Sequence, residues 1–268
     1  MASKTKKETT GLRGACMVAL ASVFEILAPY ADRMVLIGGW VPLFLLELNG
    51  TEGWSHQGSA DLDFLFQAGL SRADSNHIIQ LLKAAGCMPR PYPEWRDEYV
   101  PFSFLMDVKY GTRRDTVQID LLGLDLGSGG APNAMKSATT LALDSARTIE
   151  VPIRNTHKTI RVAGAAAMFA LKAIALMQRN LAKDGYDIYS LVKYYDNLAG
   201  EVRPLMQGPP VRNAITTVQR AFATPEARGP QGVAQYLALP PGSARERELA
   251  LDAWQTLDTF LRVLKGAR

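Results

Sequence analysis

The chain has 268 residues, of which 47% are hydrophobic and 21% charged, and its formal net charge is +4. This composition supplies a sizeable core and excludes a wholly disordered chain. The weak positive charge permits a nucleotide or nucleic-acid partner without requiring one. Two distant cysteines and three scattered histidines offer no zinc-binding spacing and favour a reduced, cytoplasmic protein. No apolar stretch approaches the about 20 residues that a membrane span needs, so no membrane partner is expected.

The first elements in chain order are a tail and a helix. Residues 1–10 are predicted to be a disordered tail. Apolar residues then recur at helical spacing at Met17, Leu20, Phe24 and Leu27. Next, "RMVLIGGW" reads as a short apolar strand that ends in Gly38 and Gly39. A helix start directly after two glycines can bind a phosphate, although glycine pairs after strands are also common in ordinary turns.

The stretch "SHQGSADLDFLF" predicts a strand that carries two acids. Side chains alternate along a strand, so Asp61 and Asp63 share one face while Leu62, Phe64 and Phe66 share the other. Two carboxylates about 5 Å apart repel by roughly 3 kcal/mol at an effective dielectric constant of about 20. Such a pair either faces water or holds a cation.

The next segments are predicted to be a helix and a hairpin. "SRADSNHIIQLLKAAG" has a helix start at Ser71 or Asp74 and a stop at Gly86. "FSFLMDVKYG" and "TVQIDLLGL" read as two strands joined by "TRRD". Arg113 and Arg114 at that tip are either exposed turn residues or contacts to an RNA backbone.

Asp120 in the second of these strands completes a candidate metal site. If this strand neighbours the one that carries Asp61 and Asp63, three carboxylates meet on one sheet surface. Oxygen ligands in that number suit Mg²⁺ or Mn²⁺, and two such ions can align a phosphoryl transfer.

The back half of the chain is helical from about residue 161. In "AAAMFALKAIALMQRNLAKDGYDIYSL" the cations Lys172, Arg179 and Lys183 are seven and four positions apart, which places them on one face of a single helix. Lys183 could equally be part of a solvent face, whereas Lys172 lies deep in an apolar run. The predicted fold is α+β, with a mixed sheet and flanking helices in residues 1–160 and a helical domain in residues 161–268.

These motifs together resemble a known family. The glycine pair before a helix, Asp-x-Asp on a strand and a lone Asp on a later strand look like the nucleotidyltransferase superfamily of DNA polymerase β. The segment around Lys172 is similar to the AbiEii-like nucleotidyltransferase toxins. The resemblance covers roughly residues 30–195, and it departs from the superfamily pattern where Trp40 stands in place of the usual Ser or Thr.

The resemblance implies a role for each matching residue. Asp61 and Asp63 would bind both metal ions, and Asp120 would hold the catalytic ion and help to activate the attacking hydroxyl. The remaining assignments are triphosphate contacts for Gly38 and Gly39, phosphate contacts for Lys172, Arg179 and Lys183, and orientation of these cations for Asp184 and Asp187.

The implied activity is transfer of a nucleoside monophosphate from an NTP to an acceptor hydroxyl, an EC 2.7.7 reaction that needs two Mg²⁺ or Mn²⁺ ions. The implied acceptor is RNA, such as a tRNA 3′ end. The implied role is that of a toxin in a toxin–antitoxin or phage-defence pair, with a cognate antitoxin as a partner. Two alternatives stay open: a small-molecule nucleotidyltransferase of the aminoglycoside-modifying type, and a non-catalytic binding module on the same fold.

Overall fold

The computed structural model describes most of the chain. Of the described residues, the side chains at positions 2–12, 133–136, 152–153 and 156 are left out of the description. The described residues are 2–47, 56, 58–90, 102–124, 133–153, 156–179 and 181–266.

The chain divides into two compact units, each built from more than one stretch of sequence. The first unit comprises residues 1–44, 55–132 and 146–163, and the second comprises residues 45–54, 133–145 and 164–268. The first unit holds the β-sheet, and the second is helical. The α+β fold class predicted from the sequence is confirmed.

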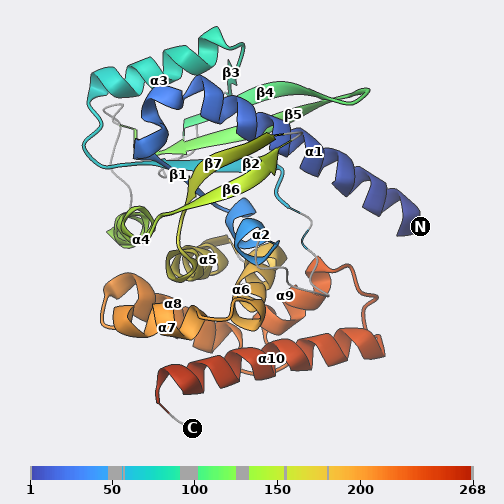
Figure 1. Cartoon of the computed structure of the whole chain (residues 1–268). Helices are drawn as coiled ribbons and strands as arrows, with labels where there is room; N and C mark the ends of the chain where they lie inside the picture. Colours follow the sequence, from blue (N-terminus) through green and yellow to red (C-terminus); the bar gives the residue numbers. More distant parts are fainter. Residues whose placement is uncertain are drawn as a thin grey trace. The chain divides into compact units, whose positions relative to one another are not determined.

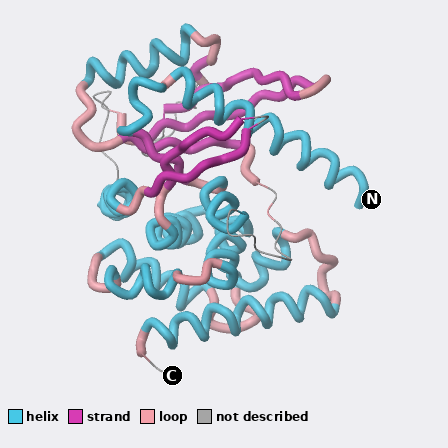
Figure 2. Tube along the Cα trace, in the orientation of Figure 1, coloured by secondary structure: helices cyan, strands magenta, loops and turns pink. Residues whose placement is uncertain are grey.

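Seven strands of the described chain form one mixed sheet in the first unit (Figures 1 and 2). The order across the sheet is β3-β4-β5-β2-β1-β7-β6. The two central pairings that matter for the site are β2 with β5, which is parallel, and β1 with β2, which is antiparallel. The strands are β1 (Met34–Ile37), β2 (Asp61–Phe66), β3 (Met88–Pro89), β4 (Phe102–Tyr110), β5 (Arg113–Leu122), β6 (Arg147–Ile153) and β7 (Thr156–Val162).

The β4–β5 hairpin turns earlier than the sequence indicated. The turn consists of Gly111 and Thr112, and Tyr110 pairs with Arg113 on either side of it. Gly111 has a φ of +59°, a left-handed conformation that glycine adopts without steric cost, so the tight turn forms here. Most of the predicted "TRRD" connection therefore belongs to strand β5.

Two long helices accompany the sheet. Helix α1 (Ala2–Ile26) packs on β4 and β5, and it begins in the segment for which the sequence predicted a tail. Helix α3 (Arg72–Ala84) starts at Ser71, whose hydroxyl accepts a hydrogen bond from the backbone N–H of Asp74 in a capping box. A short 3₁₀ helix, η1 (Ala28–Arg33), leads into β1, and α2 (Trp40–Glu47) follows it.

The second unit is a set of packed helices. Helix α5 (Ala165–Arg179) is buried over most of its length because its first six residues are apolar on every side. Every helix in the described part of the chain is too short or too polar to cross a lipid bilayer. The other elements are α4 (Asn133–Asp144), α6 (Ala182–Tyr194), α7 (Leu198–Val202), η2 (Arg203–Leu205), α8 (Pro209–Ala221), α9 (Arg228–Tyr236) and α10 (Ala244–Leu264).

Candidate active site

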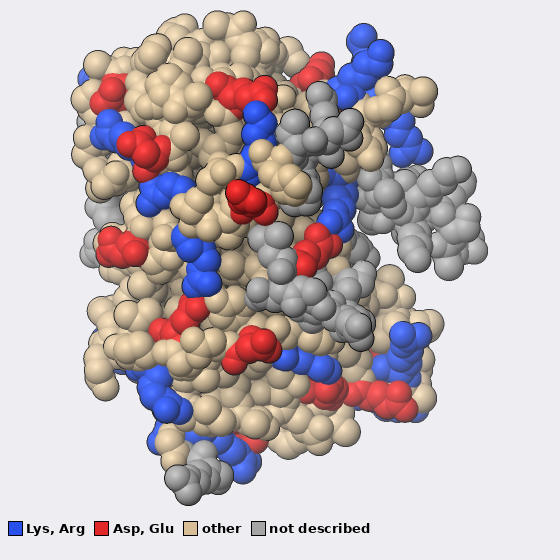
Figure 3. All heavy atoms as spheres, viewed as in Figure 1, with Lys and Arg blue, Asp and Glu red and all other residues tan. Residues whose placement is uncertain are grey.

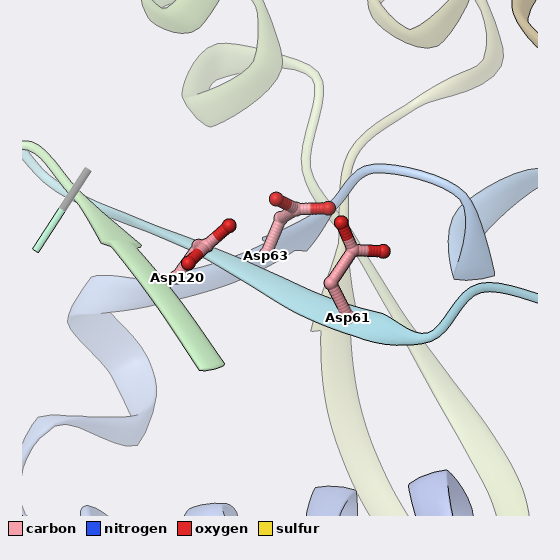
Figure 4. A group of neighbouring side chains, drawn as sticks. All are labelled: Asp61, Asp63 and Asp120. Carbon is pink, nitrogen blue, oxygen red and sulfur yellow. The ribbon is translucent and has the colours of Figure 1, made fainter. Parts of the chain in front are cut away.

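Three carboxylates converge on one face of the sheet. The pairing of β2 with β5 sets Asp63 directly beside Asp120, and Asp61 lies two residues earlier on the same face of β2. One carboxylate oxygen from each of the three acids lies within 4.8 Å of the other two (Figure 4). The structure thus brings together the three acids that the sequence singled out, and it does so through a parallel pairing of strands that are distant in the chain.

Each of two acids accepts hydrogen bonds from neutral side chains. The Ser59 hydroxyl donates to Asp61, and the Ser103 hydroxyl donates to Asp120. The Gln118 amide donates to both oxygens of Asp120, at 2.9 and 3.0 Å. The Arg90 guanidinium donates in turn to the carbonyl oxygen of Gln118. These donors orient the carboxylates while leaving their negative charge in place.

Asp120 is the most buried of the three acids, with only 7% of its surface exposed. Burial raises the pKa of its carboxyl above the ordinary value. The hydrogen bonds from Ser103 and Gln118 lower this pKa, and the nearby charge of Asp61 raises it further. The net upward direction indicates that the negative charge of Asp120 is costly here.

The glycine turn before α2 lies against this cluster. Gly38 has a φ of +78°, and a Cβ atom placed on it would lie 1.9 Å from Oδ2 of Asp63. Any other residue here would collide with the carboxylate unless Asp63 moved, and its Cβ atom would strain the left-handed backbone. Gly39 follows, is buried, and leads directly into α2. The free backbone N–H groups of the first turn of α2 therefore begin beside the acids.

The loop that enters β2 is held in place by several contacts. Gly58 has a φ of +79° and packs on the ring of Trp40. The backbone N–H of Gly58 donates to Nδ1 of His56 at 2.9 Å, and the Cys16 thiol donates to the carbonyl of Ser59 at 3.3 Å. The ring of Trp40 thus supports the loop that carries Asp61.

The second unit contains a separate group of charged residues, which we call the ion cluster: Lys172, Arg179, Asp184 and Asp187. Lys172 is 3% exposed, and its ammonium lies 2.5 Å from Asp187 and 3.4 Å from Asp184. Arg179 binds Asp184 with two hydrogen bonds, of 2.9 and 3.0 Å. Both acids are fully buried.

Burial alone would lower the pKa of Lys172, but the adjacent carboxylates of Asp187 and Asp184 outweigh it. The pKa of Lys172 therefore lies above its ordinary value, and its ammonium stays charged. The formal charges of the cluster, two positive and two negative, cancel. Asp184 and Asp187 thus form ion pairs with Lys172 and Arg179, and their predicted role in orienting these cations toward a nucleotide stays a prediction.

The three predicted cations do not share one helix. Helix α5 ends at Arg179 and α6 begins at Ala182, so Lys183 lies on a different helix from Lys172 and Arg179. The prediction of a single helix face was wrong because the chain folds back between the two helices. This reversal brings Asp184 and Asp187 of α6 against Lys172 of α5.

Four side chains of the acidic site were not placed there from the sequence. They are Ser59, Arg90, Ser103 and Gln118, of which Ser103 is the most buried, at 3% exposure. Ser103 is the direct cross-strand partner of Asp120. The hairpin register could have identified it, had the turn been placed at Gly111 and Thr112.

Comparison with known proteins gives matches to solved structures alone. No family model matches the chain, and no curated protein does. JHP933 from Helicobacter pylori is 15% identical, with coverage of 93% of this chain and 94% of that one and a TM-score of 0.43. The nucleotidyltransferase toxin MenT4 from Mycobacterium tuberculosis is 16% identical, with coverage of 98% and 99% and a TM-score of 0.42.

Proposed function

We propose that the protein is a metal-dependent nucleotidyltransferase. It transfers a nucleoside monophosphate from an NTP to an acceptor hydroxyl and releases pyrophosphate. The observation that carries this proposal is the approach of Asp61, Asp63 and Asp120 to within 4.8 Å of one another beside the Gly38 turn.

The donor set fits Mg²⁺ or Mn²⁺. These ions prefer oxygen ligands, and octahedral Mg²⁺ has ligand oxygens at about 2.0–2.1 Å, so two ligands of one ion are at most about 4.2 Å apart. Small rotations of the three carboxylates would meet that limit. Asp61 and Asp63 would hold both ions, and Asp120 would hold the ion nearest the attacking hydroxyl. Bound ions would neutralise phosphate charge and lower the pKa of that hydroxyl.

The residues of the chain would then position the reactants. Ser103 and Gln118 fix the carboxylate of Asp120, which would orient the acceptor hydroxyl toward the α-phosphorus. The acceptor oxygen forms a bond to that phosphorus as the bond to the β-phosphate oxygen breaks, and the hydroxyl proton is lost to solvent or to Asp120. Gly38, Gly39 and the first turn of α2 would contact the triphosphate through backbone N–H groups.

Lys172, Arg179 and Lys183 remain proposed phosphate contacts. Support for them comes from the resemblance of their segment to the AbiEii-like toxins. Lys172 and Arg179 are already bound by Asp184 and Asp187, so their influence on a nucleotide would depend on how these two acids hold them.

RNA is the proposed acceptor, with a tRNA 3′ end as the first candidate, and growth inhibition by the chain as a toxin is the proposed outcome. A cognate antitoxin would be its partner. Support for these finer assignments comes from the sequence resemblance and from the mild net positive charge, which favours RNA over the cationic aminoglycosides.

The test is a label-transfer assay with each α-³²P-labelled NTP, Mg²⁺ and total RNA. We expect label to enter RNA with the wild type and the rate to fall by roughly a thousandfold in Asp63→Asn, because metal-bound charge stabilisation is worth several kcal/mol. The matched control is Asp196→Asn, which removes an exposed carboxylate of the second unit.

Each result has a defined meaning. Transfer to RNA that Asp63→Asn abolishes supports the proposal. Transfer to an added aminoglycoside instead would replace RNA with a small molecule as the acceptor. Absence of transfer to any acceptor, with equal signals in wild type and Asp63→Asn, would contradict the proposal.

A further inference from the structure

The face of the sheet that carries the acids continues along the β4–β5 hairpin. Residues on one face of paired strands alternate, so Asp120, Gln118, Thr116 and Arg114 of β5 share a face. Their cross-strand partners in β4 are Ser103, Leu105, Asp107 and Lys109, in the same order. Lys109 and Arg114 therefore lie on the same face as Asp120, at the tip of the hairpin. We call Lys109 and Arg114 the tip cations.

The two positive charges of the tip cations repel each other across the hairpin. Lys109 and Arg114 face each other directly across the two strands, and both are exposed. Like charges in this arrangement destabilise a hairpin. Within the described residues neither side chain forms an ion pair. The nearest acid on the face, Asp107, accepts a hydrogen bond of 2.6 Å from Thr116.

Helix α1 packs against the opposite face of the hairpin. Tyr110 and Arg113 point to that face, and the ring of Tyr110 packs so closely on Gly14 of α1 that a Cβ atom there would lie 2.3 Å from it. Helix α1 runs across β4 and β5 on this side. Among the described residues, the side of the hairpin that faces away from α1 is therefore the side of the acids.

The distance along this face suits a polynucleotide. Six residues separate Arg114 from Asp120, which spans about 20 Å at about 3.4 Å per residue. That length corresponds to roughly six stacked nucleotides at about 3.4 Å each. Arg90, which is exposed and donates to Gln118, adds a further cation between the two ends.

We propose that the tip cations bind the phosphate backbone of the RNA acceptor about six nucleotides from the end that enters the acidic site. This inference rests on the proposed function for the identity of the acceptor. On the face shown in Figure 3 basic and acidic side chains are interspersed, while blue spheres gather near the hairpin tip.

The experiment measures RNA binding without catalysis. A fluorescein-labelled single-stranded RNA of about twelve nucleotides is titrated with the full chain in EDTA, without NTP, and anisotropy is followed at several salt concentrations. The double variant Lys109→Gln/Arg114→Gln should weaken binding roughly tenfold and reduce the salt slope by about 1.4, because each phosphate contact to a single strand contributes about 0.7.

The matched control lies one residue away. Arg113→Gln removes the same charge from the same hairpin tip, but on the opposite face, and should change affinity much less than Arg114→Gln. The melting temperature of the double variant should stay equal or rise, since a repulsive pair is removed. A stable double variant that binds RNA as tightly as wild type would overturn the proposal, as would equal losses in Arg113→Gln and Arg114→Gln.

The two proposals can fail separately. Loss of binding in the double variant without any NTP transfer by wild type would leave the RNA surface standing and remove the proposed reaction. Transfer by wild type with unchanged RNA binding in the double variant would support the proposed reaction and remove the proposed RNA surface.

Discussion

The acidic site and the ion cluster are both groups of buried or half-buried charges, but their charges are balanced differently. In the ion cluster two cations and two acids lie within ion-pair distance, and the formal charge sums to zero. In the acidic site three carboxylates meet, and the donors to Asp61 and Asp120 are neutral. A self-balanced cluster holds its fold together. A cluster of like charges lowers the stability of the protein, and cations that bind to the cluster restore that stability.

The largest expected effect on folding lies in the ion cluster. Lys172→Ala should lower the free energy of unfolding of the second unit by about 3–5 kcal/mol, because it leaves buried carboxylates without their cation. Arg179→Ala should cost about 1 kcal/mol or less, since the Arg179 side chain is 54% exposed. Urea denaturation followed by circular dichroism measures both.

A double-mutant cycle sharpens this expectation. Lys172→Met/Asp187→Asn should be more stable than the sum of the two single changes, since each single variant leaves a partner unpaired. Additive losses would mean that Lys172 and Asp187 do not stabilise each other, and the contrast between the two clusters would be lost.

Gly38→Ala should have the next largest effect, on the acidic site. The new Cβ atom would collide with Oδ2 of Asp63, so we expect a loss of about 2 kcal/mol beyond the cost of the left-handed backbone. Label transfer should also fall, because the carboxylate must move. The control is Gly86→Ala: Gly86 has a φ of +84°, and its Cβ would meet nothing within 4 Å. Equal losses in stability and rate for both variants would contradict the collision.

The smallest effect concerns the charge of Asp120 in metal-free protein. Its pKa in the folded state is raised, so the folded state binds more protons than the unfolded state, and stability is lost as pH rises through the raised pKa. Asp120→Asn removes this loss. The stability of Asp120→Asn relative to wild type in EDTA should therefore increase as pH rises above the ordinary carboxyl pKa of about 4.

A pH series of urea melts in EDTA measures this difference. The control Asp196→Asn, which removes an exposed carboxylate of the second unit, is measured in the same series. A relative stability of Asp120→Asn that falls toward neutral pH would show that the carboxylate is stabilising when ionised, against the expectation of repulsion in this cluster.

The sequence predicted the parts of the site that depend on local periodicity. The shared face of Asp61 and Asp63 follows from alternation along one strand, and the face of Asp120 follows in the same way. The sequence did not predict that β2 and β5 are neighbours, and the three-acid site was predicted only if they are. The pairing of strands about 55 residues apart depends on the whole sheet. Residues 91–101, which are rich in proline and aromatic residues, and residues 125–132, which are rich in glycine, lie outside the described part of the chain.

Two errors came from turns. The hairpin turn was placed at "TRRD" rather than at Gly111 and Thr112, which hid the pairing of Ser103 with Asp120. The reversal between Arg179 and Ala182 was missed because the segment has few turn residues, so the ion cluster was read as one cationic helix face. The first turn depends on the left-handed conformation of Gly111, and the second on the packing of α6 against α5.

The most direct test of the central claim is the response of thermal stability to Mg²⁺ alone, in wild type and Asp63→Asn. Binding at 100 times the dissociation constant stabilises by about 2.7 kcal/mol, which corresponds to a rise of several degrees in melting temperature. We predict this rise in wild type and its loss in Asp63→Asn. A melting temperature that Mg²⁺ leaves unchanged in wild type, or raises equally in both proteins, would show that the three carboxylates do not form a metal site.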